Sequence, residues 1–243
     1  TDTKKGMVVL STVNGQTVAS AKTYVGSYRN DRCIYPYPRV LCIDGYDADL
    51  AEIEVDGNAF AAACIVNCDP WKSPGGAEGA QFLTGITGLE NEDMTAGEMD
   101  ALNAKGITPF AMITSLGGAI LRKAVTTSLT SGLTKIRRRR TTDYLMDAIA
   151  ERGQFYQERA FDGDFANQTL GPISGGYISE IGSFLANEQA LGHIASYSVD
   201  GFAAATEEDL EAGRWTVDVR ARTFSDMDEI VLAHSVGDSV TTS

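Results

Sequence analysis

The sequence predicts an α/β layer followed by an α+β sandwich of two layers. Short β-branched runs alternate with helical segments over residues 30–125, which favours a sheet covered by helices. After the Ser- and Thr-rich stretch 126–134, the pattern is that of a strand, two amphipathic helices and two or three further strands. We therefore place one domain at residues 1–126 and a second at residues 127–243.

In the first part, short apolar runs between turn-forming residues predict strands, namely GMVVLSTV (6–13), RVLCI (39–43) and AEIEV (51–55). The alanine-rich run GNAFAAACIVNC predicts a buried helix. Thr95 and Glu98 have the spacing of a capping box, and Gly106 fits the end of the same helix. Two further strands are expected after that helix, in ITPFAMI and in GGAILRKAVTTS.

In the second part, the charged segment TKIRRRR (134–140) is interpreted as a strand that leads into a helix starting near Thr142. A second helix is expected from Pro172, a favourable first-turn residue, to Gly192. The segment RWTVDVRARTF alternates apolar and polar residues, as a half-buried antiparallel strand does. The apolar residues at helical spacing in the first of these helices are Leu145, Ala148, Ile149, Phe155 and Tyr156.

Composition argues against several classes of partner. The chain has 33 acidic and 20 basic residues and a formal net charge of -13, so its surface would repel nucleic acid. No stretch approaches 18 consecutive apolar residues and the first residues lack a signal-peptide pattern, so neither a membrane span nor secretion is expected. Cys64 and Cys68 could begin a metal site, but no histidine lies near them, and burial as small hydrophobes is the preferred interpretation.

Few residues suit catalysis. Only His193 and His234 are present, and no nucleophile elbow, zinc-protease or phosphate-loop motif occurs. An acidic loop with Asp44, Asp47 and Asp49 could bind a cation, although a solvated turn is the preferred interpretation. We therefore expect no catalytic residue, no cofactor and no metal.

Four consecutive arginines, Arg137 to Arg140, are the exception in this acidic chain. In a strand, alternate side chains face opposite ways, so all four could not contact one ligand. Six acidic residues and two arginines follow between positions 143 and 164, so the cluster could be neutralised from within or by another copy of the chain. Arginine favours ordered interface ion pairs because its guanidinium is planar and bidentate. We interpret the segment as a protein contact, with an exposed strand or a nucleic-acid surface as alternatives. The predicted contact residues are Arg137, Arg138, Arg139, Arg140, Asp143, Asp147 and Glu151.

The order of segments over residues 30–237 resembles that of the tail sheath proteins of contractile phages. These segments are SPGGAEGAQFLTGITGLENEDMTAGEMDALNAKGITPF, KIRRRRTTDYLMDAI, GYISEIGSFLANEQALG, YSVDG and GRWTVDVRARTFSDMDEIVL. Related sheaths occur in R-type pyocins, type VI secretion and other contractile injection systems. The family's insertion domains and the opening strands of its subtilisin-like domain have no counterpart in this chain, and its G-x-R-T signature is blurred to ILRKAVTTS.

The resemblance implies a partial, non-catalytic subtilisin-like α/β layer at 1–126 and a C-terminal α+β sheath domain at 127–243. It implies a structural subunit, not an enzyme, that polymerises around a tail tube and contracts to drive the tube through a bacterial envelope. A subunit of a bacterial contractile injection system or of a pyocin is the alternative. A hydrolase is disfavoured because a catalytic triad would need a histidine in the first part.

The resemblance also implies partners and a location. Neighbouring copies would form hexameric rings in a helical homo-oligomer, in contact with the tail tube, baseplate and tail terminator proteins, and with no nucleic acid or membrane. Assembly would take place in the host bacterial cytoplasm, and the product would be part of the virion. Family members exchange terminal strands between neighbours, and the region 137–159 is expected to contact the tube or a neighbour. The candidate donor strand is Glu229, Ile230, Val231, Leu232, Ala233, His234, Ser235 and Val236.

Overall fold

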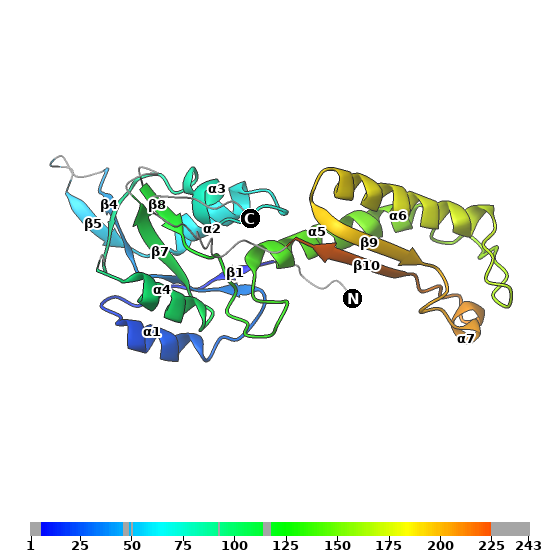
Figure 1. Ribbon diagram of the computed structural model, residues 1–243, viewed down its shortest axis with the longest axis horizontal. Helices are drawn as coiled ribbons and strands as arrows, with labels where there is room; N and C mark the ends of the chain where they lie inside the picture. Colours follow the sequence, from blue (N-terminus) through cyan, green and yellow to red (C-terminus); the bar gives the residue numbers. More distant parts are fainter. Residues whose placement is uncertain (1–5, 46–48, 50, 92, 114–117, 225–243) are drawn as a thin grey trace, which may run out of the picture.

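The computed structural model describes residues 6–45, 49, 51–91, 93–113 and 118–224. Two lobes lie end to end along its longest axis, and helix α5 (Ile136–Gln154) runs from one into the other (Figure 1). We call residues 6–135 the first lobe and residues 155–224, with the C-terminal half of α5, the second lobe. The described strands form four small sheets, so the fold is mixed α and β throughout.

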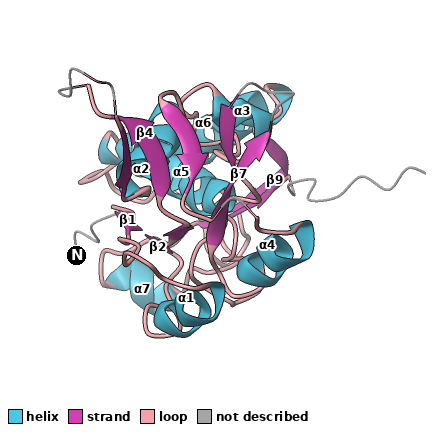
Figure 2. Cartoon of the chain, turned by 90° about the vertical axis from the view of Figure 1, so that its left-hand side faces the viewer, coloured by secondary structure: helices cyan, strands magenta, loops and turns pink. Residues whose placement is uncertain are grey.

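The first lobe contains three of these sheets. Two have three strands each, in the orders β3-β7-β8 and β5-β4-β6, and the third is the parallel pair β1-β2. Helices α2 and α3 lie on one side of the strands and α1 and α4 on the other (Figures 1 and 2). The strands are β1 (Val8–Val9), β2 (Cys33–Ile34), β3 (Pro36–Tyr37), β4 (Val40–Ile43), β5 (Glu52–Val55), β6 (Ile86–Leu89), β7 (Thr108–Ile113) and β8 (Gly118–Leu121). The helices are α1 (Val18–Val25), α2 (Asn58–Asn67), α3 (Gly76–Ala80) and α4 (Ala96–Asn103).

Each side of these strands has its own hydrophobic core. In one cluster, Phe110 of β7 packs with residues of α2, of β8 and of the loop that follows α3. The Phe110 ring lies so close to Gly57 that a Cβ atom at position 57 would be 2.4 Å from the ring. Tyr35, Tyr37 and Leu102 pack with α1 and α4 in the other cluster. Phe110, Tyr35, Tyr37 and Leu102 have no exposed surface. Burial of such large apolar side chains stabilises the lobe.

The second lobe is a two-layer sandwich. The C-terminal half of α5 and helix α6 (Pro172–Ala190) cover one face of the antiparallel pair β9 (Ile194–Asp200) and β10 (Asp218–Thr223) (Figure 1). The core of the lobe is the cluster of Leu145, Ile181, Leu185 and Ile194. A short helix, α7 (Glu207–Glu211), lies in the connection between the two strands.

Most predicted elements are present. The capping box is complete, since the Thr95 hydroxyl accepts from the Glu98 amide and the Glu98 carboxylate accepts from the Thr95 amide at 2.9 Å. Gly106 has a φ of +73°, a conformation that glycine adopts without strain. Helix α6 begins at Pro172 as predicted, and the alternating segment forms β10. Helix α1 was not predicted, although Thr17 caps it through the amide of Ser20.

The prediction that TKIRRRR forms a strand is wrong. Helix α5 begins at Ile136, so Arg137 to Arg140 are helical and no longer alternate between two faces. Arginine is a good helix former, and one apolar residue in the segment is too few to fill the buried face of a strand. The helix also ends at Gln154, which leaves Phe155 and Tyr156 outside it. The predicted donor strand 229–236 and Asp47 lie outside the described residues. Among the described residues, no helix is at once long and apolar enough to span a bilayer.

Candidate assembly interface

Helix α5 belongs to both lobes. Ile136, in its first turn, is fully buried in a cluster with Ile34, Ile65 and Ala124 of the first lobe. Leu145, further along, is buried in the core of the second lobe. The predicted contact residues therefore lie on the helix that joins a buried cluster of the first lobe to the core of the second.

In the described part of the chain, the guanidinium groups of Arg137, Arg139 and Arg140 contact other groups of the same chain. Arg137 donates to the backbone carbonyl of Phe224, directly after β10. Arg139 binds two carboxylates, as described below. Arg140 donates to the backbone carbonyls of Cys68 at 2.6 Å and Asp69 at 3.3 Å, which follow the C-terminus of α2. Carboxylates of the same chain neutralise Arg139, whereas the acceptors named for Arg137 and Arg140 are uncharged backbone carbonyls, so neutralisation within the chain is seen at Arg139.

Asp31, Arg139, Asp143 and Arg32 form a chain of ion pairs between α5 and the loop before β2. Arg32 binds Asp143 with both terminal nitrogens, at 2.8 Å each. Arg139 donates to Asp143 at 2.7 Å and to Asp31 at 2.9 Å. Paired arginine and carboxylate groups in such geometry form the stronger class of hydrogen bond.

The ion pairs change the titration of their members. Burial would raise the pKa of Asp143, but the hydrogen bonds from Arg32 and Arg139 outweigh burial and hold that pKa below its ordinary value. Burial likewise opposes the charge of Arg139, while Asp143 and Asp31 raise its pKa. Both side chains therefore stay ionised at neutral pH.

The outward face of α5 carries different residues. Met146 is 52% exposed, and Asp147, Ala150 and Glu151 are exposed beside it. Of the predicted acidic contact residues, Asp147 and Glu151 therefore face solvent, whereas Asp143 is buried. Met146 on this face was not among the predicted contact residues. Little in the sequence selects it, because a single exposed apolar residue is common on protein surfaces.

The sheet of the second lobe has a polar outer face. Arg220 and Arg222 of β10 pair in register with Ser198 and Ser196 of β9, and all four side chains are exposed. Within the described part of the chain, each of these strands pairs only with the other, so one edge of each is open to a further strand. An open edge presents unpaired backbone amide and carbonyl groups to any strand that approaches it.

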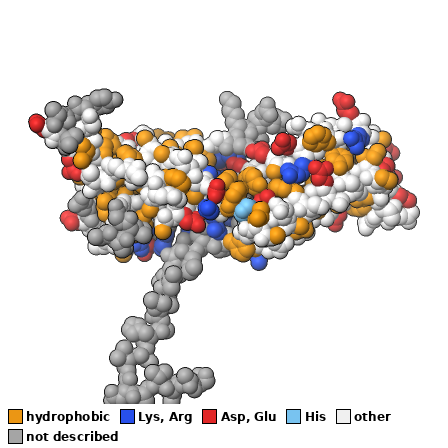
Figure 3. Space-filling model, turned by 90° about the horizontal axis from the view of Figure 1, so that it is seen from above, with side chains coloured by type: hydrophobic (Ala, Val, Ile, Leu, Met, Phe, Trp, Pro, Cys, Tyr) orange, Lys and Arg blue, Asp and Glu red, His pale blue; other side chains and the backbone are white. Residues whose placement is uncertain are grey.

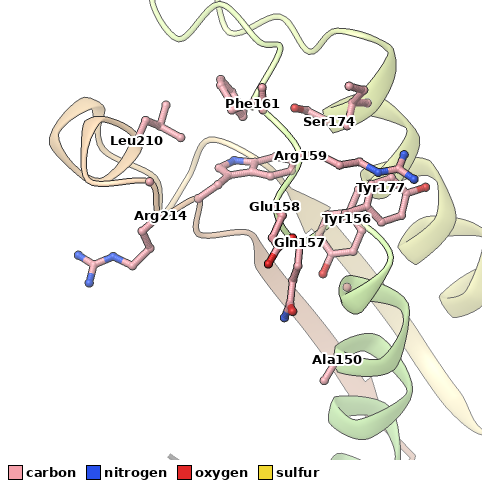
Figure 4. Close-up of a pocket in the computed structure, with 15 residues that line it drawn as sticks. Ala150, Tyr156, Gln157, Glu158, Arg159, Phe161, Ser174, Tyr177, Leu210 and Arg214 are labelled. Atoms are coloured by element: carbon pink, nitrogen blue, oxygen red, sulfur yellow. The ribbon is translucent and has the colours of Figure 1, made fainter.

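A cavity of about 700 Å³ lies at the far end of the second lobe, between the end of α5, the start of α6 and the segment after α7 (Figure 4). Aromatic rings line it, with centroid distances of 4.9 Å between Tyr156 and Tyr177 and 5.9 Å between Tyr177 and Trp215. Its described lining holds no histidine or cysteine. Nothing in that lining pairs a nucleophile with a histidine base, so the cavity gives no support to a hydrolase.

The two cysteines considered as metal ligands are engaged in the fold. Cys64 and Cys68 are buried, and the thiol of Cys64 donates to the carbonyl of Pro74 at 3.1 Å. Burial raises the pKa of Cys64 to about 12, so this thiol is not poised as a nucleophile. Over the described ranges, no three potential ligands come together to hold a metal ion.

Comparison with known proteins gave matches in structure only. No family model and no curated protein sequence matched this chain. The structure is similar to a chain of the contractile injection system PVC sheath complex in the contracted state, with a TM-score of 0.72 and 17% identity over 93% of this chain. It is similar to a chain of the anti-feeding prophage baseplate, with a TM-score of 0.71 and 16% identity over 95% of this chain.

Sheath proteins of another group are more distant. The sheath tail protein of Desulfitobacterium hafniense matches with a TM-score of 0.54 and 13% identity, over 90% of this chain and 49% of that protein. This chain spans 62% of the PVC chain and 60% of the prophage chain, so it corresponds to about three fifths of their length. The chain therefore has the fold found in contractile sheath proteins, which agrees with the resemblance read from its sequence.

Proposed function

We propose that this chain is a structural subunit of a contractile sheath, which polymerises around a tube and contracts to drive it through a bacterial envelope. The observation that carries this proposal is the match of nearly the whole chain to chains of two contractile systems. The sheath could belong to a phage virion, to an injection system or to a pyocin. An injection system is favoured, because the PVC and anti-feeding prophage chains match with higher TM-scores than the sheath tail protein of Desulfitobacterium hafniense. The role requires no bond to be made or broken.

The predicted domain boundary at residue 126 lies inside the first lobe, which extends to residue 135 and also packs against Ile136 of α5. We propose residues 1–126 as a non-catalytic, subtilisin-like layer and residues 127–243 as the C-terminal sheath domain. The second edges of β9 and β10 suit strand exchange, because no other strand in the described part of the chain pairs with them and a strand from a neighbouring copy would add there. The candidate donor remains the segment Glu229–Val236.

The outward face of α5 is the candidate contact with the tube or a neighbour. Exposed charged contacts contribute about 0.2–1 kcal/mol each, so Asp147 and Glu151 alone would hold a neighbour weakly. Repeated in every subunit of a polymer, such contacts hold a lattice and still allow it to rearrange. Met146 adds apolar area that would be buried in the contact.

Electron microscopy of the purified chain at high concentration, with and without a tube protein, tests the proposal. Hollow cylinders of uniform diameter are expected, and particles that remain monomeric under both conditions would contradict it. Deletion of the last fifteen residues should abolish the cylinders, because it removes the whole candidate donor strand, Glu229–Val236. The substitutions Met146→Glu and Glu151→Lys should weaken assembly, whereas Glu207→Gln on α7 is the matched control. Covalent labelling of one serine by a serine-reactive probe would instead favour a hydrolase.

A further inference from the structure

The two lobes also touch away from α5. Trp71, in the loop that follows α2, stacks on His193, which lies between α6 and β9. The ring centroids are 3.9 Å apart and the planes differ by 18°. The Trp71 ring also packs edge to face with Tyr144 of α5, at a centroid distance of 5.4 Å. Figure 3 shows hydrophobic side chains gathered at the middle of the molecule, between its two ends.

A buried carboxylate orients the imidazole. Nδ1 of His193 lies 2.7 Å from the carboxylate of Glu188, and the backbone amide of His193 donates to the Glu188 carbonyl at 3.0 Å. The Tyr144 hydroxyl donates to the other carboxylate oxygen of Glu188 at 3.1 Å. Glu188 is only 3% exposed, and a carboxylate so buried is stable only when its oxygens are satisfied in this way.

The loop that presents Trp71 is itself anchored. Arg140 holds the carbonyls of Cys68 and Asp69, and the Thr141 hydroxyl donates to the carbonyl of Pro70 at 3.0 Å. Trp71 therefore projects from a loop fixed to the first half of α5 toward a ring fixed to α6. The stack lies to one side of the helix axis, so it resists bending and rotation that a single connecting helix would allow.

We propose that Trp71 and His193 form a latch that holds the two lobes at one angle, with Glu188 as its positioning residue. Between Ile136 in a buried cluster of the first lobe and Leu145 in the core of the second, α5 provides about two and a half turns of helix. A helix of that length can bend when the two lobes move relative to each other. The contact between Trp71 and His193 opposes that bending, because it joins the lobes at a second point beside the helix. The chain then moves as one lever, and force applied to one lobe reaches the other. This coupling belongs to the single chain and does not depend on polymerisation.

The angular spread between the lobes tests the latch directly. Spin labels on Glu52→Cys in β5 and Glu208→Cys in α7, both exposed positions, report the interlobe distance distribution by pulsed electron resonance. The partly exposed cysteines at 33 and 42 are first replaced by alanine. We expect a narrow distribution in the parent chain and at least a twofold broader one with Trp71→Leu. Trp71→Phe, which keeps a ring for stacking, should restore the narrow distribution.

Two further variants complete the design. Phe155→Leu removes a 71% exposed aromatic side chain and should leave the distribution unchanged. Glu188→Gln keeps the shape of the side chain but removes the carboxylate that orients the imidazole, so it should broaden the distance distribution. This variant tests the latch independently, in case the Trp71→Leu chain does not fold. A folded Trp71→Leu chain with the parent's distribution would overturn the proposal. An unchanged distribution in Glu188→Gln would overturn the positioning role.

Discussion

Asp143 accepts a hydrogen bond from each terminal nitrogen of Arg32, although 111 residues separate the two in the sequence. The pair ties the middle of α5 to the loop before β2. Because Arg139 binds the same carboxylate and also Asp31, the removal of one carboxylate affects three other charged side chains. This arrangement yields the first two predictions.

Replacement of Asp143 by asparagine should destabilise the chain by about 2–3 kcal/mol, since it leaves two partly buried guanidinium groups without their shared acceptor. The free energy of unfolding from urea denaturation, followed by circular dichroism, measures the effect. Glu151→Gln, on the exposed face of the same helix, is the matched control and should change the free energy by less than about 0.5 kcal/mol. Equal effects of the two substitutions would show that the ion pairs contribute nothing.

The stability of the chain should fall in acid partly through Asp143. Its pKa is lower in the folded chain than in the unfolded one, where it is about 3.9. The group therefore contributes its full stabilisation above the unfolded pKa and loses it as the pH falls through the folded pKa. The difference in unfolding free energy between the parent and Asp143→Asn should shrink as the pH is lowered from about 5 to about 2. A difference that stays constant over that range would contradict this account.

Gly79 of α3 has no room for a side chain. A Cβ at this position would lie 1.8 Å from the carbonyl oxygen of Pro74 and 2.8 Å from the Cys64 thiol, so the backbone would have to move. Gly79→Ala should cost about 3 kcal/mol. Gly182→Ala, inside α6 with no atom within 4 Å of the new Cβ, should stabilise by about 0.5–1 kcal/mol. The two melting temperatures, compared with that of the parent, should therefore shift in opposite directions.

The capping box at the start of α4 should contribute measurably. Thr95→Ala removes the acceptor for the Glu98 amide and should cost about 1 kcal/mol. Thr95→Ser keeps the hydroxyl and should cost much less. Thermal unfolding of both variants separates the loss of the cap from the loss of the methyl group, and identical losses would argue against a contribution from the cap.

Elements with a local signal were predictable. The capping box, the proline that starts α6 and the alternation in β10 each depend on residues a few positions apart, so their pattern is visible in the chain. Arg137 to Arg140 were misassigned because arginine is compatible with a strand or a helix and the segment offers one apolar residue. Only the burial of Ile136 against Ile34 and Ile65 decides for a helix that starts there.

The contact of the arginines with a tube or a neighbour stays a prediction. The sequence indicated that acidic residues of the chain could neutralise these arginines but not which ones, because Asp31 and Asp143 meet at Arg139 only once the loop before β2 lies against α5. The exposure of Asp147 and Glu151 on the outward face likewise depends on what packs behind the helix.

The acidic charge and the elements with a local signal followed from the linear chain, because composition and periodicity are properties of neighbouring residues. The partners of Arg139 and the stack of Trp71 on His193 were decided by the tertiary structure. Such contacts join segments far apart in the chain, and only the packing of two cores onto one shared helix brings them within bonding distance.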